Sequence, residues 1–225
     1  MQPLEVTDTV RITRIPERQV TDRQVLYDVL DAGLVAHVGL VRNGLPVVLP
    51  LGYARSGDTL LLHGSSGGGL LREAAQGAPL AVTVTLLDGL VFARSLFDSS
   101  MNYRSVMVLG IATVLHGQDE LDALNVLSEH LMPGRWDEVR PSTRRELAAT
   151  LVLRLPLDQA SIKVRASGAT TAPDDGEPRQ VWAGVVPLTI QAGTPQPSED
   201  TPRQVPAPAS VLRTMRCYPN TLDLT

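Results

Sequence analysis

A series of short apolar runs, separated by turn signals, constrains the fold of this chain more than any other feature. Asn43-Gly44 and Asp88-Gly89 are typical of two-residue hairpin turns, and Ser56-Gly57-Asp58 marks a further turn. The run at 80–86 is rich in β-branched residues and partly alternates between apolar and polar side chains, as strands do. The runs cover residues 35–41, 45–53, 59–63, 80–86, 90–95 and 105–115. Six such strands joined by tight turns predict a mainly β chain with a six-stranded antiparallel barrel.

Helices that flank this barrel are predicted from their end signals. Thr21 and Gln24 form a capping box, so a helix is expected to begin at Thr21, and Gly33 suits a left-handed C-cap. Asp119 and Ser142 are expected to cap two later helices. Helices over 70–76, 120–131 and 142–149, with strands over 150–155 and 160–165, complete the predicted elements.

The composition divides the chain into three parts. Residues 1–20 are polar and irregular, which predicts an N-terminal arm. Residues 21–192 carry the predicted strands and helices, and a chain of 225 residues that is 43% hydrophobic can bury the core of one such domain. Prolines then recur at positions 195, 197, 202, 206 and 208, so residues 193–225 are expected to form an extended, proline-rich tail.

Charge and cysteine content exclude several classes of function. The net charge of −4 gives no general attraction to nucleic acid. A single cysteine, Cys217, allows neither an internal disulfide nor a cysteine-based zinc cluster, and four scattered histidines do not suggest a metal site. No apolar run has membrane-spanning length, and the N-terminus lacks the order of a signal peptide. These features predict a cytoplasmic protein without membrane or nucleic-acid partners.

The first candidate site follows the predicted strand 59–63. His63, Gly64, Ser65 and Ser66 lead from this strand through a loop of small residues toward the helix predicted at 70–76. Backbone N–H groups and the positive end of the helix dipole at such a junction can bind a phosphate, and the two hydroxyls would add donors. The stretch is equally compatible with an ordinary strand–loop–helix connection in which the glycines only permit the turn.

The second candidate site is a polar stretch before the predicted strand 105–115. Tyr103 offers an aromatic face, Arg104 a fixed cation with a fork of donors, and Ser105 a hydroxyl. The alternative is a loop in which Arg104 pairs with a local carboxylate.

Both stretches belong to a longer series of motifs that resembles a known family. Residues 88–95 (DGLVFARS) followed by 102–106 (NYRSV) are similar to the flavin-binding split-barrel relatives of pyridoxamine 5′-phosphate oxidase, which include the 5-nitroimidazole-resistance (Nim) proteins. Further similar motifs occur at 62–65, 133–136, 163–165 and 181–188. The resemblance covers about residues 11–188. It implies a six-stranded split barrel that dimerises and holds FMN at the subunit interface.

The resemblance also implies roles for particular residues. His63 would lie beside the flavin as the catalytic residue, and Trp182 would pack near the flavin ring. Lys163 would contact the cofactor, or would instead form a salt bridge in the barrel. The complete cofactor-binding set that the resemblance implies is His63, Gly64, Ser65, Ser66, Tyr103, Arg104, Ser105, Lys163 and Trp182.

The chain departs from the family pattern at two places. Relatives often carry a His-His pair where this chain has Asp98-Ser99, and a serine plus a basic residue where it has Gly68-Gly69. The second departure removes a cation from the phosphate site, so Arg72, Arg104 or Lys163 would have to replace it.

The function that these motifs imply is an FMN-binding oxidoreductase that passes electrons from a reduced nicotinamide, NAD(P)H, to a small electron-poor acceptor. Two alternatives remain open on the sequence. One is a non-catalytic module that binds flavin or haem on the same barrel, and the other is a reductase that uses the deazaflavin F420. A homodimer is expected under the leading interpretation.

Overall fold

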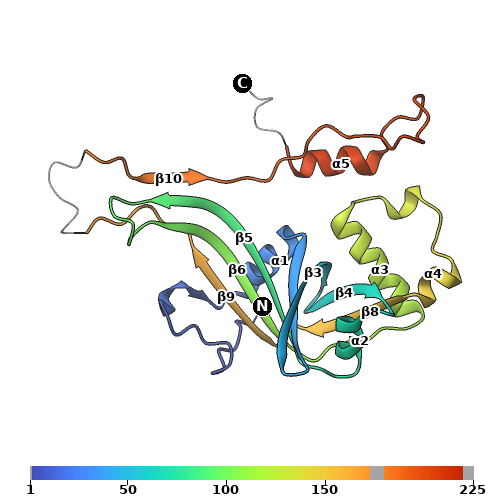
Figure 1. Cartoon of the computed structure of the whole chain (residues 1–225), viewed down its shortest axis with the longest axis horizontal. Helices are drawn as coiled ribbons and strands as arrows, with labels where there is room; N and C mark the ends of the chain where they lie inside the picture. The colour runs from blue at the N-terminus through green and yellow to red at the C-terminus, as the bar shows by residue number, and fades with distance from the viewer. Residues whose placement is uncertain (1, 173–179, 220–225) are drawn as a thin grey trace.

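Ten strands form one antiparallel sheet in the computed structural model of the protein, which describes residues 2–172 and 180–219 (Figure 1). The sheet order is β1-β9-β6-β5-β2-β3-β4-β8-β7, and β10 pairs with β5 outside this path. The strands are β1 (Gln19–Val20), β2 (Val35–Arg42), β3 (Leu45–Ser56), β4 (Thr59–Ser65), β5 (Leu80–Phe92), β6 (Ser100–Gly110), β7 (Thr113–Val114), β8 (Thr150–Pro156), β9 (Gln159–Arg165) and β10 (Gly184–Pro187). The mainly β prediction is confirmed, whereas the six-stranded count is not.

Strand β3 pairs with different strands along its two parts. Residues 45–52 of this strand pair with β2, and residues 53–56 pair with β4, so one long strand belongs to both halves of the sheet. The Asn43-Gly44 hairpin before it is confirmed, since both residues have the positive φ angles of 51° and 78° that a tight hairpin turn requires. Gly57, with a φ of 56°, forms the turn to β4 as predicted.

The hairpin predicted at Asp88-Gly89 is wrong, because these residues lie inside the single strand β5. The register against β6 shifts between Leu87 and Gly89, so Asp88 is the extra residue of a β-bulge. Strand β10 pairs with the same residues, and a Cβ atom on Gly89 would lie only 2.9 Å from the backbone oxygen of Val186. The glycine therefore permits the close approach of β10 rather than a chain reversal.

Helices lie on the sheet and at its ends. They are α1 (Arg23–Ala32), α2 (Gly69–Ala75), α3 (Gln118–Leu131), α4 (Arg144–Ala148) and α5 (Ala209–Cys217), with 3-10 turns η1 (Pro16–Arg18) and η2 (Trp136–Glu138). No helix of the described residues has the length and apolar character needed to cross a membrane.

The predicted helix ends differ from the observed ones by one or two residues. Asp22, not Thr21, caps α1, because its carboxylate accepts the N–H of Gln24 at 2.8 Å. Gly33 ends α1 with a φ of −83° and is therefore not a left-handed cap. The caps of α3 and α4 are Gly117 and Thr143 rather than Asp119 and Ser142.

Two apolar clusters stabilise the fold from opposite faces of the sheet. In the larger one, α1 packs its buried Leu26 and Leu30 among strand residues such as Tyr53. In the smaller one, Leu127 of α3 packs against Leu61 of β4 and its neighbours. Because side chains alternate along a strand, Leu61 and Leu62 contribute to different clusters.

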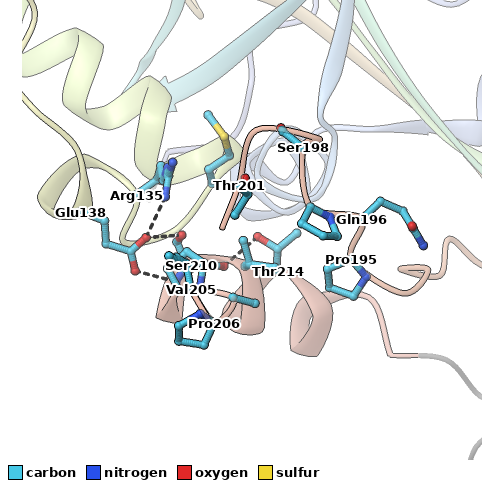
Figure 2. A pocket seen from close by; sticks show the side chains of 15 residues that line it. Arg135, Glu138, Pro195, Gln196, Ser198, Thr201, Val205, Pro206, Ser210 and Thr214 are labelled. Atoms are coloured by element: carbon cyan, nitrogen blue, oxygen red, sulfur yellow. Dashed lines mark hydrogen bonds and ion pairs between the residues drawn. The ribbon is translucent and has the colours of Figure 1, made fainter. Parts of the chain in front are cut away.

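The two terminal segments both contact the rest of the chain. Leu4 and Val10 of the N-terminal segment are buried, and β1 pairs with β9. The C-terminal segment runs from β10 as extended chain and then forms α5, which the proline content did not predict (Figure 1). Figure 2 shows where this segment is held: Ser210 donates its backbone N–H to Glu138 at 2.9 Å, and its hydroxyl donates to the same carboxylate. These bonds lower the pKa of Glu138.

Candidate functional site

Strand β6 separates the residues of the second candidate site onto two faces of the sheet. This strand begins at Ser100, so residues predicted as a loop are extended, and alternation puts Tyr103 and Ser105 on one face and Arg104 on the other. Tyr103 lies opposite Arg165 of β9, and Ser105 lies opposite Lys163. The hydroxyls of Ser105 and Thr85 are 3.0 Å apart and share a hydrogen bond.

Arg104 binds a carboxylate from the bulge in β5. Its Nη2 and Nε atoms donate to the two oxygens of Asp88 at 2.7 and 3.0 Å, which is a bidentate pair. The hydrogen bonds to Asp88 raise the pKa of the guanidinium. The structure thus matches the alternative interpretation of Arg104, in which a nearby carboxylate satisfies the cation.

A cavity of about 600 Å³ lies on the Tyr103 face, where the N-terminal segment crosses the end of β9. Two of the predicted cofactor residues, Tyr103 and Lys163, line it. Lys163 donates its Nζ to the backbone oxygen of Arg14 at 3.1 Å, which ties β9 to the arm. The described residues that line it are Arg14, Ile15, Arg18, Phe97, Asp98, Ser99, Ser100, Tyr103, Lys163, Arg165 and Thr170.

Three cations of this cavity were not among the predicted site residues. Arg165 follows Lys163 at the strand spacing of two, so the motif at 163–165 carried a signal for it. Arg14 and Arg18 carried none, because they lie in an irregular segment about 150 residues from β9 in the sequence. Only the packing of this segment on β9 brings these cations to the cavity.

The first candidate site lies on β4 and the loop that follows it. His63 is half-buried, and its Nδ1 atom is buried with no hydrogen-bond partner among the described residues. Burial lowers the pKa of the imidazole, so this side chain is neutral at neutral pH. His63 shares a strand face with Leu61, the face that α3 covers.

The loop donors after His63 are partly used within the chain. Ser66 donates its N–H to the backbone oxygen of Ala149 at 2.9 Å and its hydroxyl to that of Ala148 at 3.3 Å. Ser65 accepts the N–H of Gly67. Gly64 lies close to α2, since a Cβ atom there would be 2.6 Å from a methyl of Leu71.

A cation does reach the start of α2, although it was not among the predicted ones. A Cβ atom on Gly69 would lie 2.7 Å from Nη2 of Arg42, which places the guanidinium directly over the first helical residue. Arg42 also donates its Nε to Glu73 at 2.6 Å. Arg42 therefore occupies the region where the Gly68-Gly69 departure removes a basic side chain.

Trp182 lies at a third place, beside the bulged end of β5. It is 65% exposed and packs on Phe92, with the ring centres 6.0 Å apart and the planes at 57°. Three strands, β5, β2 and β3, lie between β6 and β4 in the sheet order. The predicted site residues therefore form separate groups within one chain, around His63, around Tyr103 and around Trp182.

Comparisons with known proteins give the family of this chain. The family model described as pyridoxamine 5′-phosphate oxidase matches residues 22–164. The chain belongs to this family. Among curated proteins, none matches it.

Two solved structures are similar to nearly the whole chain. One is described as the FAD and heme binding protein from Mycobacterium smegmatis, with 46% identity, a TM-score of 0.84, and coverage of 88% of this chain and 97% of that one. The other is described as the flavocytochrome Anf3 from Azotobacter vinelandii, with 36% identity, a TM-score of 0.84, and coverage of 92% and 96%. A putative 5-nitroimidazole antibiotic resistance protein from Bacteroides thetaiotaomicron shares the fold, with 22% identity, a TM-score of 0.56, and coverage of 65% and 86%.

The segment that matches the family model, residues 22–164, does not contain every residue of the candidate site. It includes His63, Tyr103 and Lys163, whereas Arg14, Arg18 and Trp182 lie outside it. The arm and the C-terminal segment therefore lie outside the part of the chain that the family model describes.

Proposed function

We propose that the protein binds a flavin and a haem and acts as an oxidoreductase that moves electrons through them. The observation that carries this proposal is the 46% identity to the Mycobacterium smegmatis protein over 97% of its length, since that protein is described as binding FAD and heme. The similarity to a flavocytochrome over 96% of its length supports the same pair of cofactors. Reduced nicotinamide is the proposed electron donor, and a small electron-poor molecule is the proposed acceptor.

The chain has residues that fit a flavin. A flavin nucleotide needs cations for its phosphates and an apolar or aromatic surface for its ring. Lys163 and the arginines of the cavity supply the charge, and Tyr103 supplies an aromatic face beside them. Trp182 and Phe92 form a second, exposed aromatic pair. In this proposal, Asp88 holds Arg104 in place rather than leaving it free for phosphate.

His63 is the residue that would hold a haem iron in this proposal. A haem iron is commonly held by a neutral imidazole. One ring nitrogen then binds the iron through its lone pair, and the other can donate its N–H to a nearby group. The buried Nδ1 of His63 has no partner among the described residues, and burial keeps the ring neutral. A proton on this ring would have to leave before ligation, and the lowered pKa makes that loss easier.

The protein side of the mechanism is binding, orientation and exclusion of water. When bound, a flavin exchanges one or two electrons and a haem iron exchanges one. His63 would fix the haem, and Lys163 with the cavity arginines would fix the flavin phosphate. The rigid pairing of β4 with β8 and of β6 with β9 would hold these two sets at a constant separation.

The visible spectrum of the purified protein tests this proposal. We expect flavin bands together with a Soret band, and we expect anaerobic NADPH to bleach the flavin bands. The control is the same protein after unfolding and removal of small molecules, to which FAD and haem are then added back. A colourless protein that takes up neither FAD nor haem would contradict the proposal, and uptake of F420 alone would favour the deazaflavin alternative.

We also propose that the protein is a homodimer, as expected from the sequence. Leu90, Phe92, Met101 and Trp182 are large apolar side chains that are each at least 39% exposed. They lie close together, because Leu90 pairs with Met101 across β5 and β6, and Trp182 packs on Phe92. Apolar patches of this kind mark interaction sites. We expect light scattering at micromolar concentration to give twice the chain mass, and a monomer would contradict the proposal.

A further inference from the structure

We propose that the cavity between the N-terminal arm, β6 and β9 binds the diphosphate of FAD and thereby selects FAD over FMN. This inference rests on the proposed flavin binding and adds the part of the flavin that the cavity recognises. It assigns a binding role to Arg14, Arg18 and Arg165.

The charge of the cavity is strongly unbalanced. Among the described residues, its lining contains four basic side chains, those of Arg14, Arg18, Lys163 and Arg165, and one carboxylate, Asp98. None of the four cations forms an ion pair with a carboxylate among residues 2–172 and 180–219, although seven other arginines of this part of the chain do. Four cations that share one cavity with a single carboxylate repel one another, and a bound anion would reduce that cost.

Arg165 is the second, independent indication of a ligand. It is only 5% exposed, and its hydrogen bonds go to uncharged oxygens of Asn102, Ser167 and Gly168. Its Nε atom is buried with no partner among the described residues. Burial, together with repulsion from Arg18, lowers the pKa of this guanidinium. A buried cation without an anion is unfavourable, so a phosphate group at this place would stabilise it.

The arrangement of the cations suits two linked phosphates better than one. Lys163 and Arg165 lie two residues apart on one face of β9, so their Cα atoms are about 6.6 Å apart. Arg14 and Arg18 add charge from the arm. Such a row can contact oxygens on both phosphates of a diphosphate. The aromatic rings of Tyr103 and Phe97 in the same lining offer a surface for the adenine that FMN lacks.

Haem propionates are a less suitable occupant of this cavity. They would also bring negative charge to the arginines, but the described residues of the lining include no histidine, cysteine or methionine that could ligate the iron. His63 lies on β4, which three strands separate from β6.

The experiment measures how apoprotein variants bind FAD, FMN, riboflavin and haem. Arg18→Gln and Lys163→Gln each remove one cation of the cavity, whereas Arg165 is left intact because it also holds the chain after β9. Arg144→Gln is the matched control, since Arg144 is an exposed cation on α4, outside the cavity lining. Circular dichroism verifies that each variant is folded, and fluorescence titration at one fixed ionic strength gives the flavin affinities.

We expect each cavity variant to bind FAD about ten- to a hundredfold more weakly, which corresponds to one lost charge-assisted contact. Riboflavin and haem affinity should not change, FMN affinity should fall less than FAD affinity, and Arg144→Gln should bind FAD like the wild type. If wild-type protein binds no flavin, the proposed function itself fails. If wild-type protein binds FAD but both cavity variants bind it equally well, only the cavity assignment is overturned. An equal loss for FMN and FAD overturns the selection, and a loss for haem alone identifies propionates as the occupant.

Discussion

Replacing His63 with alanine is expected to abolish stable haem binding while the chain stays folded. The substitution removes a half-buried imidazole whose Nδ1 has no partner within the described chain, so no internal hydrogen bond of that atom is lost. Loss of a supporting partner of a metal ligand weakens metal binding roughly 10- to 100-fold, and loss of the ligand itself should exceed that. Haem titration followed at the Soret band measures the effect.

His116→Ala is the matched control for this variant, because His116 is exposed on the connection between β7 and α3. It should bind haem like the wild type. An unchanged Soret band in His63→Ala would contradict the proposal that His63 would hold the haem iron. A shifted flavin spectrum with normal haem binding would instead support the role beside the flavin that the sequence resemblance implied.

The largest loss of stability from a single methyl group is expected for Gly33→Ala. A Cβ atom at this position would lie 2.6 Å from Cγ1 of Val84 and 2.7 Å from the hydroxyl oxygen of Tyr53. Both side chains are almost fully buried and cannot move into solvent. Overpacking of this kind costs about 1–3 kcal/mol. The Tyr53 hydroxyl donates to the Leu30 oxygen at 2.6 Å, and disturbing that buried bond would add roughly 1–3 kcal/mol.

Urea unfolding of this variant would give the change in the free energy of unfolding. The backbone of Gly33 already has an extended conformation that alanine accepts, so the substitution adds no backbone strain, and the loss of unfolded-state entropy works against the steric cost. Gly193→Ala is a suitable control, because a Cβ atom there would have no neighbour within 4 Å. Equal stability of the two variants would mean that Val84 and Tyr53 can move away from a Cβ atom at position 33, so that the packing of α1 against β3 and β5 is not tight there.

Turns were predictable from the sequence only where local preference decided the conformation. Asn43-Gly44 forms its hairpin because both residues adopt positive φ angles that few other residues accept. Asp88-Gly89 has the same local preference but lies within β5, since pairing with β6 on one side and β10 on the other stabilises the extended form. Sequence periodicity could not reveal the partner β10, which lies about 95 residues later in the chain.

Only part of the candidate site could be predicted, again because local sequence does not reveal long-range packing. Tyr103 was identified in a polar stretch before a predicted strand, and Lys163 from the family resemblance; their cross-strand neighbourhood follows from the pairing of β6 with β9. Arg104 could not be assigned to the opposite face without knowing that β6 begins at Ser100. The arginines of the arm reach the cavity only through the packing of an irregular segment, and no periodic pattern encodes such packing.

The short strands at both ends of the sheet limit how copies of this protein can assemble. The described sheet ends in β1 and β7, and each of these strands has only two residues. These two strands themselves offer few unpaired backbone groups for adding a strand from another molecule, whereas β10 pairs with β5 alone among the described strands. Growth into open-ended fibrils by edge pairing at β1 and β7 is disfavoured, so contacts between copies are expected to use side chains on the faces of the sheet or the edge of β10, which favours small, closed assemblies.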